Sequence, residues 1–254
     1  MATRDFAPSP VFVGIVALTA LGGWLTWSGV GNAHLGAFLF VAGGWVVSLC
    51  LHEYAHAVTA YRGGDFSVVG RGYLRLDPLK YTHPVLSIVL PLAFLLLGGI
   101  GLPGGAVWVN RAAVRSRAWE SLIGFAGPGV NLLCAVALVL PFSFGVDPFG
   151  AHSAFWVSVA FLAFLQLTAS VLNLVPMLGV DGGNLVEPWL SAQWQRGYRL
   201  VAPYGMLLLI ALLWTPVLNN LFFTFIFALG SRLGLPVEAV GDGLRLFQFW
   251  GRVF

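Results

Sequence analysis

Charged side chains are scarce in this chain. Asp, Glu, Lys and Arg make up 9% of its 254 residues, whereas hydrophobic residues make up 58%. A soluble domain usually carries about 25% charge, so the composition argues against a soluble protein and predicts an integral membrane protein with the lipid bilayer as a partner. The net charge is only +3, and the arginines lie between apolar runs. We therefore expect no binding to nucleic acid.

Cysteine is almost absent as well. Cys50 and Cys134 both lie inside apolar runs, where buried packing thiols are more common than a disulfide. The chain has no C-x-x-C pair, which excludes a zinc ribbon. Internal repeats, low-complexity linkers and an appended soluble domain are not visible either, so we expect residues 1–254 to form a single membrane-embedded domain.

Long apolar runs are what the chain does contain. The runs that can cross about 30 Å of hydrocarbon are roughly Pro10–Val30, Leu35–Val58, Leu122–Phe144, Phe155–Leu174 and Leu200–Leu229. The last run contains Pro216 near its middle, so either one tilted helix or a hairpin that turns near Pro216 fits it. The predicted fold class is an all-α polytopic membrane protein with about five to six transmembrane helices.

Two further segments are less regular. Residues 84–101 are apolar but contain Pro91 and end in a glycine-rich sequence, and basic loops flank them on both sides. A re-entrant segment would keep both basic loops in the cytoplasm, as the positive-inside rule prefers. Such non-helical backbone at membrane depth must line a cavity or be buried in protein. Residues 66–76 alternate partly between polar and apolar, which predicts a short β-like loop to which an extended peptide could add.

The most informative motif is H-E-Y-A-H at residues 52–56, near the end of the second apolar run. On a helix, His52 and His56 share one face, about 6 Å apart along the axis, so both can bind one Zn²⁺. Glu53 is rotated by about 100° from His52 and is placed to act on a water molecule at the metal. Ionisable residues at the edge of a membrane-length segment are costly and are therefore functional candidates.

Two histidines leave a catalytic zinc one ligand short, because such sites normally use three protein ligands and water. Asp181, in the sequence V-D-G-G, follows the fourth apolar run, which Pro176 ends. In a five-span arrangement, the ends of the second and fourth runs reach the same membrane face. We therefore expect Asp181 to join His52 and His56. A turn or helix-capping role for Asp181 is the alternative, and the two roles are compatible.

These motifs resemble those of the site-2 protease family of intramembrane zinc metalloproteases. The family signature is H-E-x-x-H on one helix and N-x-x-P…L-D-G on a later one, and this chain has N-L-V-P…V-D-G between residues 173 and 182. A third family element, G-P-x-x-N, is present at residues 127–131. The resemblance covers about residues 46–204 and looks like the compact subgroup without PDZ or CBS domains. Relatives often have a second proline before the Asp, where this chain has Leu178-Gly179.

The resemblance implies a zinc metalloendopeptidase with one Zn²⁺ per chain and transmembrane proteins as substrates. The implied metal ligands are His52, His56 and Asp181, and the implied substrate-binding residues are Asn131 and Asn173. Glu53 would be the general base that takes a proton from water and returns it to the leaving amine. Asn131 would lie near the substrate backbone or the oxyanion. A hydrogen bond to a neighbouring helix is the competing role for Asn131.

Within the single domain we distinguish an N-terminal helix (1–34), a catalytic core (35–214) and a hydrophobic or amphipathic tail (215–254). We expect a multi-pass protein of a prokaryotic cell membrane with its active site nearer the cytoplasmic face. The alternative function is a catalytically idle scaffold that binds transmembrane helices. An ion transporter would have polar residues at midplane depth on several spans and inverted repeats, and neither is visible. The sequence leaves the oligomeric state open.

Overall fold

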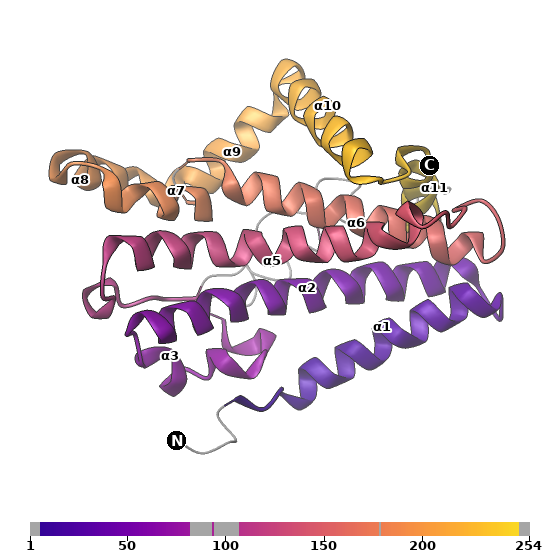
Figure 1. Ribbon diagram of the computed structural model, residues 1–254, viewed down its shortest axis with the longest axis horizontal. Helices are drawn as coiled ribbons and strands as arrows, with labels where there is room; N and C mark the ends of the chain where they lie inside the picture. Colours follow the sequence, from indigo (N-terminus) through magenta and orange to yellow (C-terminus); the bar gives the residue numbers. More distant parts are fainter. Residues whose placement is uncertain (1–5, 82–92, 94–106, 178, 249–254) are drawn as a thin grey trace.

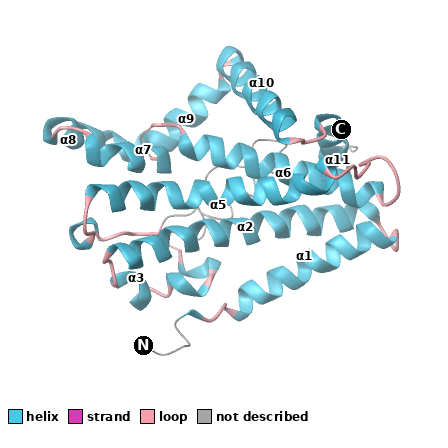
Figure 2. Ribbon diagram, in the orientation of Figure 1, coloured by secondary structure: helices cyan, strands magenta, loops and turns pink. Residues whose placement is uncertain are grey.

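The computed structural model describes residues 6–81, 93, 107–177 and 179–248, and this part of the chain is helical without a β-strand (Figures 1 and 2). Its α-helices are α1 (Pro10–Ser28), α2 (Ala33–Gly63), α3 (Ser67–Gly70), α5 (Arg117–Ser143), α6 (Ser153–Leu174), α7 (Asp181–Val186), α8 (Ala192–Val201), α9 (Gly205–Trp214), α10 (Pro216–Leu233) and α11 (Val237–Phe247). Six helical stretches of the described chain are long and apolar enough to span a membrane. The predicted all-α polytopic fold is confirmed.

Helices α1 and α2 form an antiparallel pair that packs closely through small residues (Figure 1). A Cβ atom on Gly22 would lie 2.8 Å from the carbonyl oxygen of Gly36, and one on Gly36 would lie 3.0 Å from Thr26 Cγ2. In a bilayer, such small residues let two helix backbones approach and gain van der Waals contact. The pair therefore holds α2 against α1 on one side and leaves its other side for α5 and α6.

Helices α2, α5 and α6 form the centre of the molecule, and α6 is the most buried of them. Their facing side chains build the main core, which includes Val41, Trp45, Ala135, Phe161 and Ala163. The amphipathic tail segment forms α11. It packs on α6 and α2, and its buried residues include Ala239, Val240 and Phe247, so the central helices cover its apolar face.

The last long apolar run is broken at Thr215, where Pro216 begins α10 as the first helical residue. Helices α9 and α10 meet there at an angle and stand away from the central layer (Figure 1). However, α9 begins beside Gly179, close to α7, whereas the Gly234 cap of α10 lies beside Ser143 at the far end of α5. Together the two helices lead from one end of the bundle to the other. The run is thus neither one straight helix nor a hairpin that returns.

The β-like loop predicted for residues 66–76 is wrong. This segment contains α3 and a 3₁₀ turn, η2 (Tyr73–Arg75). The Asp65 carboxylate accepts hydrogen bonds from the backbone N–H and the hydroxyl of Ser67, at 3.0 and 2.6 Å, which favours a helical turn there. Gly72 and Leu76 adopt left-handed backbone conformations that interrupt an extended chain. The partial alternation was too weak a signal to outweigh this local capping.

Residues 84–101, predicted to be re-entrant, lie outside the described residues apart from residue 93. The described flanks of this segment both contact α2. The Tyr81 hydroxyl donates to the carbonyl oxygen of Cys50 at 3.2 Å, and the backbone N–H of Val107 hydrogen-bonds to the Glu53 carboxylate. The chain thus leaves and rejoins the described structure beside the second half of α2.

Candidate metal centre

The two histidines of the H-E-x-x-H motif lie one turn apart on α2, and both are buried. Their Nε2 atoms are 3.1 Å apart. Asp181, the first residue of α7, brings its carboxylate to the same point: Oδ2 lies 3.1 Å from His52 Nε2 and Oδ1 lies 3.3 Å from His56 Nε2. The structure therefore brings together one nitrogen from each histidine and a carboxylate oxygen within 4.8 Å of one another.

The outer nitrogen of each imidazole has an oxygen acceptor. His56 Nδ1 lies 2.6 Å from the backbone carbonyl oxygen of Ile123, and His52 Nδ1 contacts the side-chain oxygen Oδ1 of Asn131. Because a carbonyl oxygen only accepts hydrogen bonds, Nδ1 must carry the proton in both rings. In the neutral rings, both Nε2 lone pairs then point at the Asp181 carboxylate, as metal-binding histidines require.

This geometry fits a tetrahedral Zn²⁺. Ligand bonds of about 2.0–2.1 Å at tetrahedral angles place two ligand atoms about 3.3 Å apart, close to the 3.1–3.3 Å separations between the donor atoms. A cation between them would satisfy lone pairs that otherwise face one another. The backbone also leaves space: a Cβ atom on Gly127 would lie 2.5 Å from His52 Nε2 and closer still to His56 Nε2. Only a residue without a side chain fits beside the two donors.

Asp181 owes its position to the docking of α7 onto α5. A Cβ atom on Gly124 would lie 2.8 Å from the backbone nitrogen of Leu185, so this glycine lets the two helices touch. The Ser121 hydroxyl donates to the carbonyl oxygen of Leu185 at 2.7 Å. Arg111 adds a hydrogen bond of 2.9 Å to Asn184. The aspartate is thus fixed by its helix and not by a flexible loop.

The end of α7 is also held by ion pairs to a buried carboxylate. Glu187 is 3% exposed, and its two carboxylate oxygens contact Arg111 at 2.5 Å and Arg199 of α8 at 2.7 Å. The two arginines reach it from the exposed side and compensate its charge, whereas removal of both would leave a buried charge without a partner. These ion pairs therefore join the Asp181 helix to the segment at Arg111 and to α8.

Asp181 supplies the anionic member of the donor set. A carboxylate binds a metal in its deprotonated form. Two neutral histidines and one carboxylate form a ligand set that catalytic zinc sites use.

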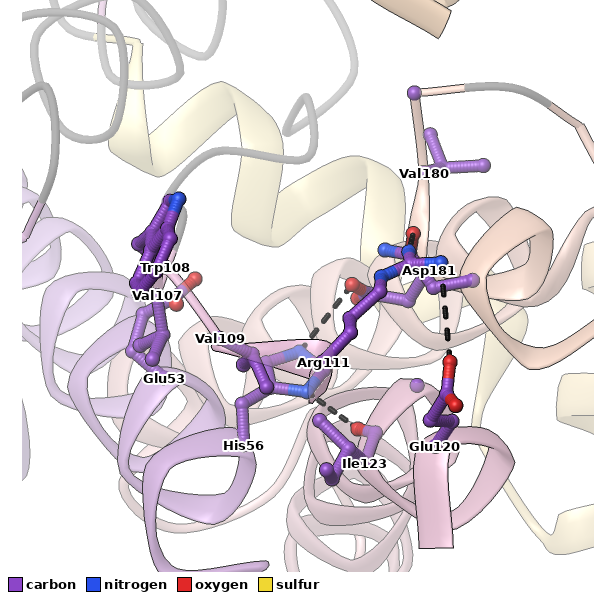
Figure 3. Close-up of a pocket in the computed structure, with 13 residues that line it drawn as sticks. Glu53, His56, Val107, Trp108, Val109, Arg111, Glu120, Ile123, Val180 and Asp181 are labelled. Atoms are coloured by element: carbon purple, nitrogen blue, oxygen red, sulfur yellow. Dashed lines mark hydrogen bonds and ion pairs between the residues drawn. The ribbon is translucent and has the colours of Figure 1, made fainter. Parts of the chain in front are cut away.

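Glu53 lies beside the donors and faces a cavity of about 400 Å³ (Figure 3). The residues that line this cavity include Glu53, His56, Val107, Arg111, Gly124 and Asp181. Glu53 is 1% exposed, and its Oε2 atom has no hydrogen-bond partner among the described residues. A buried carboxylate oxygen without a partner is costly, so Glu53 is a candidate to interact with a molecule bound in the cavity.

Comparison with known proteins gives the family. No protein-family model matches the chain, and no solved structure matches it. A protein of Mycolicibacterium smegmatis named "Putative zinc metalloprotease Rip2" is 44% identical over 255 residues, which cover 99% of this chain and 97% of the relative. The protein of that name from Mycobacterium tuberculosis H37Rv is 44% identical over 247 residues, 96% of this chain and 94% of the relative. The chain belongs to the site-2 protease family.

A more distant relative of this family member is the Bacillus subtilis protein named "Putative zinc metalloprotease YwhC". It is 27% identical over 189 residues, which cover 68% of this chain and 78% of the relative. With the apolar helices of the described chain, membership of the family indicates a multi-pass membrane protein. Its H-E-x-x-H motif and its later Asp lie on separate helices that meet at one site.

The two asparagines of the site-2 protease motifs lie away from the cavity wall. Asn131 is behind His52, where its amide also donates to Gln166 of α6 at 2.8 Å. Asn173 is buried near the C-terminal end of α6. The cavity lining that the structure describes includes neither residue. Contact of Asn131 or Asn173 with a substrate stays a prediction.

Two contributors to the site escaped the sequence analysis. Gln166 was part of a long apolar run and was given no role, although a lone amide within such a run is a signal of buried function. Gly127 was noted only as part of a motif, and its proximity to the histidines depends on how α5 crosses α2. That crossing is set by packing between segments distant in sequence, which spacing along one chain does not reveal.

Proposed function

We propose that this member of the site-2 protease family is an intramembrane zinc metalloendopeptidase. It would hydrolyse peptide bonds in or near the transmembrane segments of membrane-protein substrates, with one Zn²⁺ per chain. The observation that carries the proposal is the cavity lined by Glu53, His56 and Asp181. His52 joins His56 and Asp181 in the donor set, and Glu53 has an oxygen without a partner among the described residues. The metalloprotease names of the relatives support the same reaction class.

The chemistry of the side chains assigns a separate role to the metal ligands and to Glu53. A zinc ion held by the two histidines and Asp181 would supply Lewis-acid chemistry and make a water molecule acidic enough to react near neutral pH. The backbone N–H of Val107 holds one side of the Glu53 carboxylate, which leaves Oε2 free for a proton. Glu53 would take the proton from the attacking water and pass it to the leaving amine. One carboxylate oxygen is thus anchored while the other reacts.

The substrate must present an extended peptide bond to this cavity. A transmembrane helix has its backbone hydrogen bonds satisfied internally, so it would have to unwind locally before its carbonyl group could approach. Residues that weaken helices, such as glycine, would favour this opening in the substrate. We therefore propose transmembrane proteins with helix-breaking residues near the cut as the substrate class.

The charge distribution supports a cytoplasmic position for the site. Basic residues gather at the end of the bundle that carries the metal centre: Arg62, Arg71, Arg75, Lys80, Arg111, Arg115, Arg117, Arg196 and Arg199. The opposite end carries Arg232 and Arg245 beside Asp147, Glu238 and Asp242. The positive-inside rule favours the first end as the cytoplasmic one. The relatives are bacterial proteins, so we propose a prokaryotic cell membrane.

The test joins metal content to cleavage in purified, detergent-solubilised protein. A transmembrane-helix substrate with a central glycine would be offered to the wild type, to Glu53→Gln and to a matched control, Glu238→Gln, at the far end of the molecule on α11. We expect about one zinc per chain in all three. Loss of a general base usually costs about 10²- to 10⁴-fold in rate, so Glu53→Gln should lose cleavage at least 100-fold while the control cuts normally.

Two outcomes would contradict the proposal. Unchanged cleavage by Glu53→Gln would remove Glu53 as the general base. A folded wild-type protein without stoichiometric zinc, prepared without chelator, would overturn the metalloprotease. If every variant binds zinc and none cuts any of a panel of helices, the protein is the catalytically idle scaffold that binds transmembrane segments.

A further inference from the structure

A chain of buried hydrogen bonds runs away from the metal centre across the three central helices. His52 of α2 contacts Asn131 Oδ1 of α5, and Asn131 Nδ2 donates to Gln166 Oε1 of α6 at 2.8 Å. Gln166 Nε2 then donates to the Ser48 hydroxyl of α2 at 2.7 Å. That hydroxyl donates to the backbone carbonyl oxygen of Trp45 at 2.8 Å. The four side chains are each at most 5% exposed.

The series of hydrogen bonds has one direction of donation, and the bond at Trp45 sets it. The carbonyl oxygen of Trp45 only accepts, so the Ser48 hydroxyl donates its one proton to that oxygen. Its own oxygen can then only accept a hydrogen bond from Gln166. Gln166 must then turn its NH₂ group to Ser48 and its oxygen to the next residue, Asn131. Each amide can donate from one end and accept at the other, so one orientation dictates the next along the chain.

The last link decides whether His52 can bind a metal. With Gln166 Oε1 facing it, Asn131 turns its NH₂ group to Gln166 and its oxygen to His52 Nδ1. The ring must then carry its proton on Nδ1 and keep the Nε2 lone pair for the metal. A reversed Asn131 amide would place N–H against Nδ1, and the neutral ring would hold its proton on Nε2, where it blocks the ligand position.

We infer that Gln166 is a positioning residue that fixes the metal-binding tautomer of His52 by setting the orientation of the Asn131 amide. This assignment deepens the proposed zinc-dependent function and rests on it. Gln166 does not touch the metal donors, and it acts only through Asn131. His56 needs no orienting residue of this kind. Its Nδ1–H donates to the backbone carbonyl oxygen of Ile123, which can only accept.

The experiment measures zinc affinity in the full-length, detergent-solubilised protein by competition with a chromophoric chelator. Gln166→Met keeps the length of the side chain and removes both hydrogen bonds. Indirect partners of metal ligands usually contribute about 10- to 100-fold in affinity, and we expect a loss of about 10-fold here. Gln166→Glu should stay near the wild type, because a carboxylate still accepts from Asn131 and from a rotated Ser48 hydroxyl.

The background variant Asn131→Asp separates orientation from packing. A carboxylate presents an acceptor to His52 in either orientation, so Gln166→Met should cause no further loss of zinc affinity in that background. Ser170→Ala is the matched control. Ser170 is buried one turn along α6 from Gln166. Its hydroxyl donates to the carbonyl oxygen of Pro128 at 2.9 Å and is not one of the groups that link His52 to Trp45. It should bind zinc as the wild type does.

The assignment is overturned if Gln166→Met binds zinc with wild-type affinity. It is equally overturned if the loss is the same in both backgrounds, or if Ser170→Ala loses as much, since a packing defect would then explain the result. Should Gln166→Met fail to fold, Ser48→Ala tests the same direction of bonding, because it removes the group that orients Gln166. The readout is zinc binding, so a protein that binds zinc but never cuts would overturn the protease and leave this assignment standing.

Discussion

Gly127 lies on α5 between the two histidines of α2, where other residue types would place a side chain among the metal donors. A Cβ atom at this position would lie 2.7 Å from His52 Cδ2 and still closer to the Nε2 atoms of both histidines. Gly127 lies inside α5 directly before Pro128, and the close approach of the two imidazoles requires a residue without a side chain there. This makes the residue a sensitive probe of whether the donors bind a metal.

Gly127→Ala should abolish zinc binding while the helices stay folded. The methyl group would occupy the metal position. Because Gly127 precedes Pro128, whose ring disfavours helical backbone at a preceding residue with a Cβ atom, we expect no gain in helix stability from alanine. Metal analysis of the purified protein should show less than about a tenth of the wild-type zinc, since the donors can no longer converge. Circular dichroism should show unchanged helix content.

The matched control for this variant is Gly129→Ala, in the same motif on the same helix. The nearest atom to its added Cβ would be in the ring of Phe125, at 3.1 Å, and that ring can move by a few tenths of an ångström. Zinc content should therefore match the wild type. Equal zinc in both variants would show that the metal does not lie between His52, His56 and Asp181.

At the scale of elements, the segment that starts at Val107 links the loop after α2 to the general-base candidate. The buried carboxylate of Asp65 accepts from the backbone N–H of Asn110 at 2.7 Å and from Ser67 at the start of α3. Three residues before Asn110, Val107 hydrogen-bonds to the Glu53 carboxylate. Asp65 therefore fixes the strip of backbone on which the orientation of Glu53 depends.

Asp65→Ala should slow cleavage without removing zinc. The Asn110 N–H would lose its partner, at a cost of about 1–3 kcal/mol in the free energy of unfolding, and Val107 would hold Glu53 less firmly. A small misplacement of a catalytic group can cost about 100-fold in rate, so we expect a 10- to 100-fold lower kcat in an assay with a transmembrane-helix substrate. Zinc content should stay at the wild-type level, because Asp65 contacts none of the three donor residues in the described structure.

The control is Asp77→Ala, which removes a capping aspartate that, in the described part of the chain, accepts from the backbone N–H of Leu79 at 3.1 Å. Both variants delete an aspartate that caps a short helical turn in the same region, but Asp77 does not reach the strip at Val107. Cleavage by Asp77→Ala should match the wild type. Loss of zinc in Asp65→Ala, or equal rates in the two variants, would contradict the proposed link to Glu53.

At the scale of the molecule, much of the arrangement could be predicted from the sequence because hydrocarbon thickness sets the length of an apolar run. The runs that begin at Pro10 and Leu35 became α1 and α2 with ends shifted by a few residues, and H-E-x-x-H kept its helical spacing. The partners of Asn131 could not be predicted, since they depend on which helices lie side by side. The β-like loop predicted for residues 66–76 was wrong because the Asp65 side chain caps a helical turn there. This local interaction outweighed the weak alternation of polar and apolar residues.

The path of the last long run could not be settled by composition, because one tilted helix and a hairpin contain the same residues. Contacts settle it. Near the N-terminus, the Ser9 N–H bonds to the Arg75 carbonyl oxygen at 2.8 Å, at the end that carries the metal centre. Near the C-terminus, His34 Nδ1 lies 2.7 Å from the carbonyl oxygen of Leu246, at the opposite end. The chain therefore crosses from one end of the bundle to the other an odd number of times.

Cysteine accessibility in intact cells tests this path. In a background without Cys50 and Cys134, Asp77→Cys would report the metal-centre end, and Asp147→Cys and Asp242→Cys would report the other. With the basic end in the cytoplasm, a membrane-impermeant maleimide should label the latter two in intact cells and Asp77→Cys only after permeabilisation. A hairpin that returns at Pro216 would instead bring Asp242→Cys to the side of Asp77→Cys, so joint labelling of those two would refute the crossing by α9 and α10.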